Sequence, residues 1–198
     1  MRHIDLSRHG ITTQDIRRNL PPAELYAEAI RDEQAKVLRT IRPMKVTEMI
    51  RGQFRGYRED PGVYLSRTFE DVKGYDDIVM LRDIDVESHC EHHMVPIIGV
   101  AHIAYLPDKK VVGLSKLARL LDVFAKRLQI QEKMTAQIAN TINDVLKPQG
   151  VGVIIKAAHH CMATRGVHKA DTDLVTSRML GCFRDNALTR QEFLGIAV

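Results

Sequence analysis

The stretch Ser88-His89-Cys90-Glu91-His92-His93 places one thiol and three imidazoles within six residues of a chain that holds three cysteines and nine histidines. Cys90 and His93 are three positions apart, a chelate spacing that lets one tight turn direct both side chains at the same ion. A smaller cluster, His159-His160-Cys161, follows much later in the chain. Cys161 can supply a third ligand only if the fold brings the two segments together.

The number of ligands indicates what kind of metal site this would be. A structural zinc site is normally closed by four protein groups, whereas a catalytic site has three and keeps a position for water. Cys182 lies in an apolar setting that is typical of a buried thiol, so three ligands remain. Three ligands favour a zinc ion that activates water near neutral pH. On spacing alone, a structural metal clip and metal-free core histidines stay open as alternatives.

Cysteine nucleophilic catalysis is a competing chemistry, because Cys161 neighbours His159 and His160. A cysteine that is committed to zinc is unavailable as a nucleophile, so the two hypotheses exclude each other. The sequence has no phosphate-binding loop and no dinucleotide fingerprint of the glycine-rich kind. Any phosphate would therefore be held by side chains and helix termini.

Composition bounds the class of protein. With 198 residues, 44% of them hydrophobic and 27% charged, the chain can build one good core, as a soluble globular protein does. It has no apolar run long enough to span a membrane and no secretory signal. Two of three cysteines lie beside histidines, which fits metal ligation in a reducing, cytoplasmic compartment. The net charge of +4 is scattered among acids, and we expect no nucleic-acid partner.

Hydrophobic periodicity predicts an N-terminal arm and helical segment over residues 1–62 and a main domain over 63–198. Helices are expected over 23–41 and 44–54, followed by a loop over 55–62. Strands are expected over 78–87, 97–106, 151–158 and 175–183, with a short return at 111–112. Helices are expected from an N-cap at Ser115 to Leu128, from about 130 to 146, and over 188–194. Strand pairs around two helices indicate an α+β domain with an antiparallel sheet.

Six motifs in one order resemble the GTP cyclohydrolase I family, over about residues 63–195. They are Cys90–His93, Gly113–Arg119, Gln129–Glu132, His159–Met162, Arg165–Val167 and Thr189–Leu194. The resemblance implies a tunnelling fold (T-fold), with a four-stranded antiparallel sheet, two helices and added N-terminal helices. It also implies a homodecamer of two pentamers, with active sites at subunit interfaces.

The resemblance also implies roles for individual residues. The zinc ligands would be Cys90, His93 and Cys161. His92 and His159 would transfer protons, and Ser115 would lie near the ribose and phosphates with a catalytic role. Glu132 with Gln131 would anchor guanine, and Lys116, Arg119 and Arg165 would contact the triphosphate.

The activity implied is hydrolytic opening of the GTP imidazole ring and rearrangement to 7,8-dihydroneopterin triphosphate with release of formate, in pterin and folate biosynthesis. The N-terminal third departs from the family pattern, and Lys45 stands where the family has a phosphate-binding arginine. Lysine keeps the charge but loses the bidentate fork. This departure motivates the alternative of a non-catalytic or divergent paralogue that binds a purine or pterin nucleotide and regulates or assembles with a true cyclohydrolase. A related T-fold enzyme acting on pterins or deazapurines is a third, less supported reading.

Overall fold

The computed structural model describes residues 43–69, 74 and 77–197. Two compact units divide the chain, Met1–Met49 and Ile50–Val198. The arm over 1–22 and the helix predicted over 23–41 lie outside the described residues, as does the side chain of Lys45. Helix α3 (Pro43–Gln53) agrees with the helix predicted over 44–54.

The segment after α3 is more regular than the predicted loop over 55–62. It forms a 3₁₀ turn, η2 (Arg55–Arg58), and a short helix, α4 (Pro61–Leu65), before strand β1 (Thr68–Phe69). The carboxylate of Asp60 accepts a hydrogen bond from the Gly62 N–H at 2.9 Å and caps α4, whose first position is proline. The loop prediction was therefore wrong over 55–58 and 61–62.

The main domain is built on one sheet of four long strands. They are β2 (Val79–Cys90), β3 (Pro96–Leu106), β6 (Gly150–His159) and β7 (Asp173–Gly181), all antiparallel to their neighbours. A two-residue strand, β5 (Leu128–Gln129), adds to the edge in parallel with β2, giving the order β5-β2-β3-β6-β7. The predicted antiparallel sheet is confirmed, with β5 as an addition. The short strand β4 (Val111–Val112) pairs with β1 in a separate ribbon.

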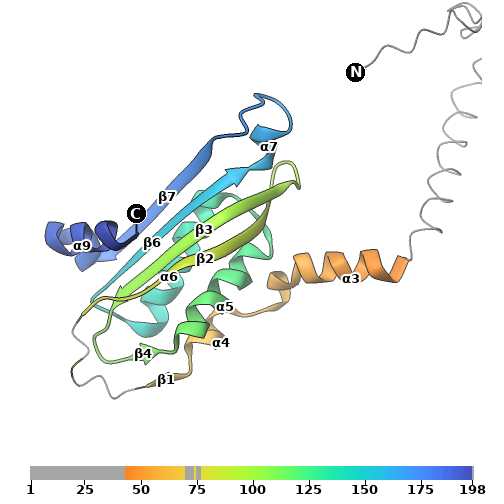
Figure 1. Cartoon of the computed structure of the whole chain (residues 1–198). Coiled ribbons are helices and arrows are strands. Elements are labelled where there is room, and N and C mark those ends of the chain that lie inside the picture. The colour runs from red at the N-terminus through yellow and green to blue at the C-terminus, as the bar shows by residue number, and fades with distance from the viewer. Residues whose placement is uncertain (1–42, 70–73, 75–76, 198) are drawn as a thin grey trace, which may run out of the picture. The chain divides into compact units, whose positions relative to one another are not determined.

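Two helices, α5 (Leu114–Ala125) and α6 (Gln131–Leu146), cover one face of this sheet (Figure 1). The buried side of α5 is the predicted one: Leu117, Leu120, Leu121, Phe124 and Ala125. Two details of the prediction were wrong. Gly113, in extended backbone, is the N-cap in place of Ser115, and Leu128 lies in β5 because the chain leaves the helix at Lys126.

Among the described residues, α8 (Cys182–Asp185) and α9 (Ala187–Ala197) cover one end of the opposite face of the sheet. Phe183 and Phe193 are fully buried there and meet edge to face, with ring centroids 5.4 Å apart. Gly152 lies beneath them on β6, where an added Cβ would be 2.9 Å from both rings. β7 ends at Gly181, whose positive φ starts α8. The strand predicted over 175–183 therefore lies two residues earlier, over 173–181.

The sheet register positions the site. The turn that joins β2 to β3 lies beside the end of β6, because Ile97 pairs with His159 and Ser88 pairs with Ile97. Helix α7 (His160–Ala163) follows β6 immediately and lies at the same end of the sheet as this turn (Figure 1). Both cysteine–histidine clusters therefore meet at one end. Within the described part of the chain, no helix combines the length and the apolar character that crossing a bilayer requires.

Candidate metal centre

A tight turn holds Cys90 and His93 together, as their spacing predicted. The Met94 N–H donates to the Cys90 carbonyl at 2.8 Å, and the Cys90 N–H donates to the Val95 carbonyl at 2.9 Å. Met94 adopts a left-handed conformation, with φ of 54°, which reverses the chain within four residues. Cys90 is only 5% exposed, whereas His93 lies at the surface of the turn.

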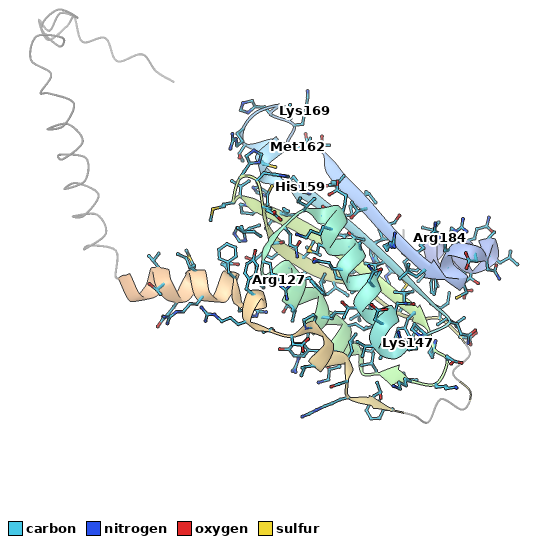
Figure 2. The ribbon with its side chains drawn as sticks, turned by 180° about the vertical axis from the view of Figure 1, so that it is seen from behind. Arg127, Lys147, His159, Met162, Lys169 and Arg184 are labelled. Carbon is cyan, nitrogen blue, oxygen red and sulfur yellow. The ribbon has the colours of Figure 1, made fainter. Side chains whose placement is uncertain are left out.

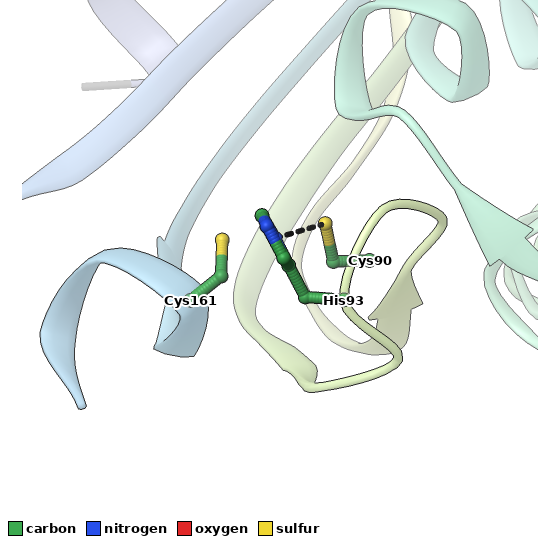
Figure 3. Close-up of side chains that lie close together, drawn as sticks. All are labelled: Cys90, His93 and Cys161. Atoms are coloured by element: carbon green, nitrogen blue, oxygen red, sulfur yellow. Dashed lines mark hydrogen bonds between the residues drawn. The ribbon is translucent and has the colours of Figure 1, made fainter. Parts of the chain in front are cut away.

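Cys161 reaches the same place from α7. The ligand atoms of Cys90, His93 and Cys161 all lie within 4.8 Å of one another, and Figure 3 shows the two sulfurs on either side of the imidazole. The Cys90 Sγ is 3.9 Å from the His93 Nδ1. The predicted meeting of the two clusters is thus confirmed.

This group fits a divalent metal ion. Tetrahedral zinc with ordinary Zn–S and Zn–N bonds separates its sulfur and nitrogen ligands by about 3.6 Å, close to the observed 3.9 Å. Two thiolates and one imidazole form a ligand set that is found in catalytic zinc sites. The group within the described residues has three members. Without a cation, burial and the neighbouring Cys90 raise the pKa of Cys161, and a coordinated ion would reverse that shift by binding the thiolate.

A pocket of about 200 Å³ opens beside the three ligands. Besides the ligands, its lining is His92, Gln129, Ile130, Gln131, Glu132, His159 and Leu174. The fold therefore brings seven of the eleven predicted site residues to one pocket. Sequence reasoning gave no role to Gln129, Ile130 and Leu174; the first two belong to the motif at 129–132, whereas Leu174 carried no signal.

The two predicted proton-transfer histidines enter this pocket from different segments. His92 lies in the turn, with its Nδ1 3.9 Å from the Cys90 Sγ. His159 ends β6, and its Nε2 is 2.8 Å from the Oε1 of Gln131. Burial lowers the pKa of His159, and the nearby Glu132 carboxylate acts in the opposite direction. Figure 2 shows His159 at one end of the sheet and Lys147, which ends α6, at the other, so α6 begins at the pocket.

Glu132 and Gln131 occupy the first turn of α6 but differ in accessibility. Glu132 is exposed, and its carboxylate lies where the helix dipole favours negative charge. Gln131 is fully buried, and both ends of its side-chain amide are engaged by protein groups. Only Glu132 therefore presents a free hydrogen-bonding side chain of this pair.

The residues predicted for the ribose and triphosphate lie elsewhere in the described chain. Ser115, Lys116 and Arg119 are in the first half of α5, and Arg119 acts electrostatically on Tyr64 of α4. Figure 1 places α4 and β4 at the end of the sheet opposite α7. Arg165 is exposed in the loop that follows α7. None of these four residues lines the pocket of the single chain.

The family model described as GTP cyclohydrolase I matches residues 23–197. GTP cyclohydrolase 1 of Hyphomonas neptunium is 56% identical over 154 residues, which cover 78% of this chain and 75% of the relative. GTP cyclohydrolase 1 of Maricaulis maris is 51% identical, covering 77% and 74%, and that of Brucella anthropi is 52% identical, covering 77% and 71%.

Proposed function

This chain belongs to the GTP cyclohydrolase I family, whose members have the T-fold, and we propose that it converts GTP to 7,8-dihydroneopterin triphosphate and formate. The observation that carries this proposal is the convergence of the three-ligand group, two histidines and a free carboxylate on one pocket. No observation on the described residues favours the alternative of a non-catalytic paralogue.

Zinc is the metal that we propose for Cys90, His93 and Cys161. Thiolate and imidazole ligands suit zinc, and a three-ligand group keeps a position for water. When bound, zinc supplies Lewis-acid activation of a water nucleophile near neutral pH. Cys90 ends β2, His93 lies in the β2–β3 turn and Cys161 lies in α7 after β6. Because β3 pairs with both β2 and β6, the sheet itself holds the three ligands together.

Glu132 is the group that we assign to guanine recognition. Its two carboxylate oxygens can accept hydrogen bonds from N1–H and from the 2-amino group at the same time. Adenine has no N1–H donor, so it cannot satisfy both oxygens. The exposure of Glu132 at the pocket supports this assignment.

His159 and His92 are the groups that we assign to proton transfer. Both line the pocket beside the metal ligands, and an imidazole side chain can both give and take a proton in general acid–base catalysis. One histidine protonates N7 of the guanine ring as C8 is attacked, which makes the ring a better electrophile. Later proton transfers accompany loss of C8 as formate and closure of the pterin ring.

Binding of the triphosphate is assigned to Lys116, Arg119 and Arg165, with Ser115 beside the ribose. Lys116 precedes the end of α5 at Ala125 by nine residues, about 13 Å along the helix axis. The pocket lies beyond that end, so a neighbouring copy of the chain would supply Ser115, Lys116 and Arg119. Arg165 instead lies in the loop after α7, the helix that carries Cys161. We therefore propose a homo-oligomer with shared sites, which in this family is a decamer of two pentamers. A cytoplasmic location follows from the need to keep the two thiol ligands reduced.

The test is a turnover assay on one preparation of verified metal content. Protein with one zinc per chain should release formate from GTP and yield a pterin that fluoresces after oxidation. His159→Ala should keep its zinc and lose turnover. Absence of both products from zinc-loaded protein would refute the proposed function, and persistence of activity in His159→Ala would refute the assignment of His159.

A further inference from the structure

We propose that Gln131 is a positioning residue that fixes the tautomer of His159, so that Nε2 carries the proton and Nδ1 is the nitrogen that serves the reaction. The role of Nδ1 rests on the proposed function; the tautomer itself rests on hydrogen-bond geometry alone. This inference gives Gln131 a different task from the guanine contact that the family resemblance implies.

The orientation of the Gln131 amide is determined by its neighbours. Its Nε2 lies 3.0 Å from the Ile155 carbonyl oxygen and 3.0 Å from the Leu174 carbonyl oxygen. Backbone carbonyls only accept hydrogen bonds, so the atom that faces them must be the donor NH₂ group. The amide oxygen, Oε1, is therefore the atom that faces His159.

Two threonines support the same orientation. The Thr135 hydroxyl donates to the Gln131 carbonyl at 2.7 Å, so its oxygen is free to accept from the Thr176 hydroxyl, also at 2.7 Å. The Gln131 NH₂ group has two hydrogens for three acceptors, so the Thr176 oxygen, 3.1 Å from Nε2, shares one of them with a carbonyl oxygen. Both threonines are at most 9% exposed, and Gln131 is fully buried. The Gln131 amide thus donates to Thr176, Thr176 donates to Thr135, and Thr135 donates to the Gln131 backbone carbonyl. A flipped amide would set its oxygen against the lone pairs of Thr176 and of the two carbonyls.

The consequence falls on His159, whose Nε2 is 2.8 Å from Oε1 of Gln131. Because Oε1 can only accept, Nε2 must carry a hydrogen. The opposite tautomer would place two lone pairs against each other at 2.8 Å and would leave the amide oxygen of the fully buried Gln131 facing no donor on His159. The neutral ring therefore keeps its lone pair on Nδ1.

A residue that selects a tautomer acts on the catalytic step rather than on substrate affinity. Gln131→Met preserves the shape of the side chain but removes the acceptor. We expect kcat to fall by about 10–100-fold, with KM for GTP within about twofold and one zinc per chain retained. Gln137→Met, the same substitution on the same helix, should leave kcat unchanged. An increase in KM with unchanged kcat in Gln131→Met would overturn the proposal in favour of a substrate contact.

The tautomer can also be observed without turnover. Zinc-loaded protein with ¹⁵N-labelled histidine, held at about pH 8 so that the ring is neutral, should show His159 with a protonated Nε2 and an unprotonated Nδ1. The signal is identified by its loss in His159→Ala. A protonated Nδ1 in the wild-type protein would overturn the proposal even if GTP turnover is normal. Conversely, the predicted tautomer in a protein that does not consume GTP would leave the tautomer assignment intact and refute only the proposed function.

Discussion

The Nζ of Lys126 lies 2.7 Å from the Oε2 of Glu87, and this contact ties the end of α5 to the strand that delivers Cys90. Lys126 is only 9% exposed, so its ammonium group depends on this partner. Glu87 also accepts a hydrogen bond from Gln53 at 3.2 Å. The hydrogen bond from Lys126 is the main cause that lowers the pKa of Glu87, and the hydrogen bond from Gln53 lowers it further.

Removing the charge of Glu87 should therefore destabilise the domain. Glu87→Gln leaves the buried Lys126 ammonium without a carboxylate, and we expect the free energy of unfolding to fall by about 1–2 kcal/mol. Asp85→Asn, on the same strand and exposed, is the control and should change it by less than about 0.5 kcal/mol. Urea denaturation of the zinc-loaded proteins measures both. Equal losses in the two variants would show that the Lys126 contact contributes nothing specific.

A second prediction concerns His102, which lies on β3 across from the bulge in β2. The Asp83 N–H donates to its Nδ1 at 3.2 Å, and the ring is 7% exposed. Burial lowers the pKa of His102. The Asp83 carboxylate partly offsets this lowering, and the positive charge of Arg82 adds to it. In the unfolded chain histidine titrates near pH 6.5, so below that pH the unfolded state binds more protons and stability falls.

We expect this loss of stability to be smaller in His102→Gln, because glutamine can accept from the Asp83 N–H without titrating. The melting temperature is measured at pH 7.5 and at pH 5.5 for both proteins. All other titratable groups are the same in the wild-type protein and in His102→Gln. The difference between their falls in melting temperature therefore reports the contribution of His102. Identical declines would contradict the expected contribution.

The third prediction separates the two cysteines that lie outside the β2–β3 turn. Cys161→Ser removes a metal ligand, so zinc affinity should fall by more than about 100-fold, beyond the loss of an outer-shell partner, and turnover should be abolished. Cys182→Ser changes a half-buried thiol at the start of α8 and should keep one zinc per chain. Metal analysis after dialysis against a weak chelator gives the readout. Loss of zinc from both variants would indicate a general defect in folding.

The fourth prediction concerns substrate recognition by Glu132. Glu132→Gln keeps the shape of the side chain but loses the paired acceptor, so kcat/KM for GTP should fall by about 10–100-fold, the factor that corresponds to a charged hydrogen bond. Most of this loss should lie in KM. Asp144→Asn, further along the same helix, should be without effect. Steady-state kinetics with GTP measure both variants. An unchanged KM in Glu132→Gln would show that Glu132 does not bind guanine.

The fifth prediction tests the small core beneath α8 and α9. Gly152→Ala would push a methyl group to within 2.9 Å of Phe183 and Phe193, and overpacking of this kind costs about 1–3 kcal/mol. Gly195→Ala, in α9 with no atom within 4 Å of the new methyl group, should be neutral or stabilise the protein by up to about 1 kcal/mol. Thermal unfolding compares them. A neutral Gly152→Ala would mean that the two rings can move apart without loss.

The sequence predicted those elements whose periodicity is strong. Leu117, Leu120 and Leu121 recur at helical spacing, and α5 buries them as expected. The same periodicity failed at Leu128, because an apolar residue beyond the helix end satisfies the pattern equally well from a strand. The N-cap at Ser115 failed because extended backbone at Gly113 starts the helix two residues earlier, without a side-chain cap.

The candidate site was predicted as far as its residue types allow. The spacing of Cys90 and His93 predicted that one turn holds both, and the later cysteine–histidine cluster indicated Cys161 as the third ligand. The structure brings all three together. The task of Gln131 could not be read from the sequence, because its partners come from β6, β7 and α6 and only the folded sheet assembles them. Buried polar side chains are recognised by their surroundings rather than by their spacing.

The way in which the ligands meet also bears on how the protein matures. Cys161 follows His93 by 68 positions, and only the pairing of β3 with β6 brings α7 against the β2–β3 turn. Closing so long a loop has an entropic cost that the isolated turn cannot meet. A nascent chain that has made only β2 and β3 therefore offers at most two ligands and should hold zinc weakly. Tight zinc uptake thus marks the moment at which β6 has paired with β3, and a chain with a misregistered β6 would be left without metal.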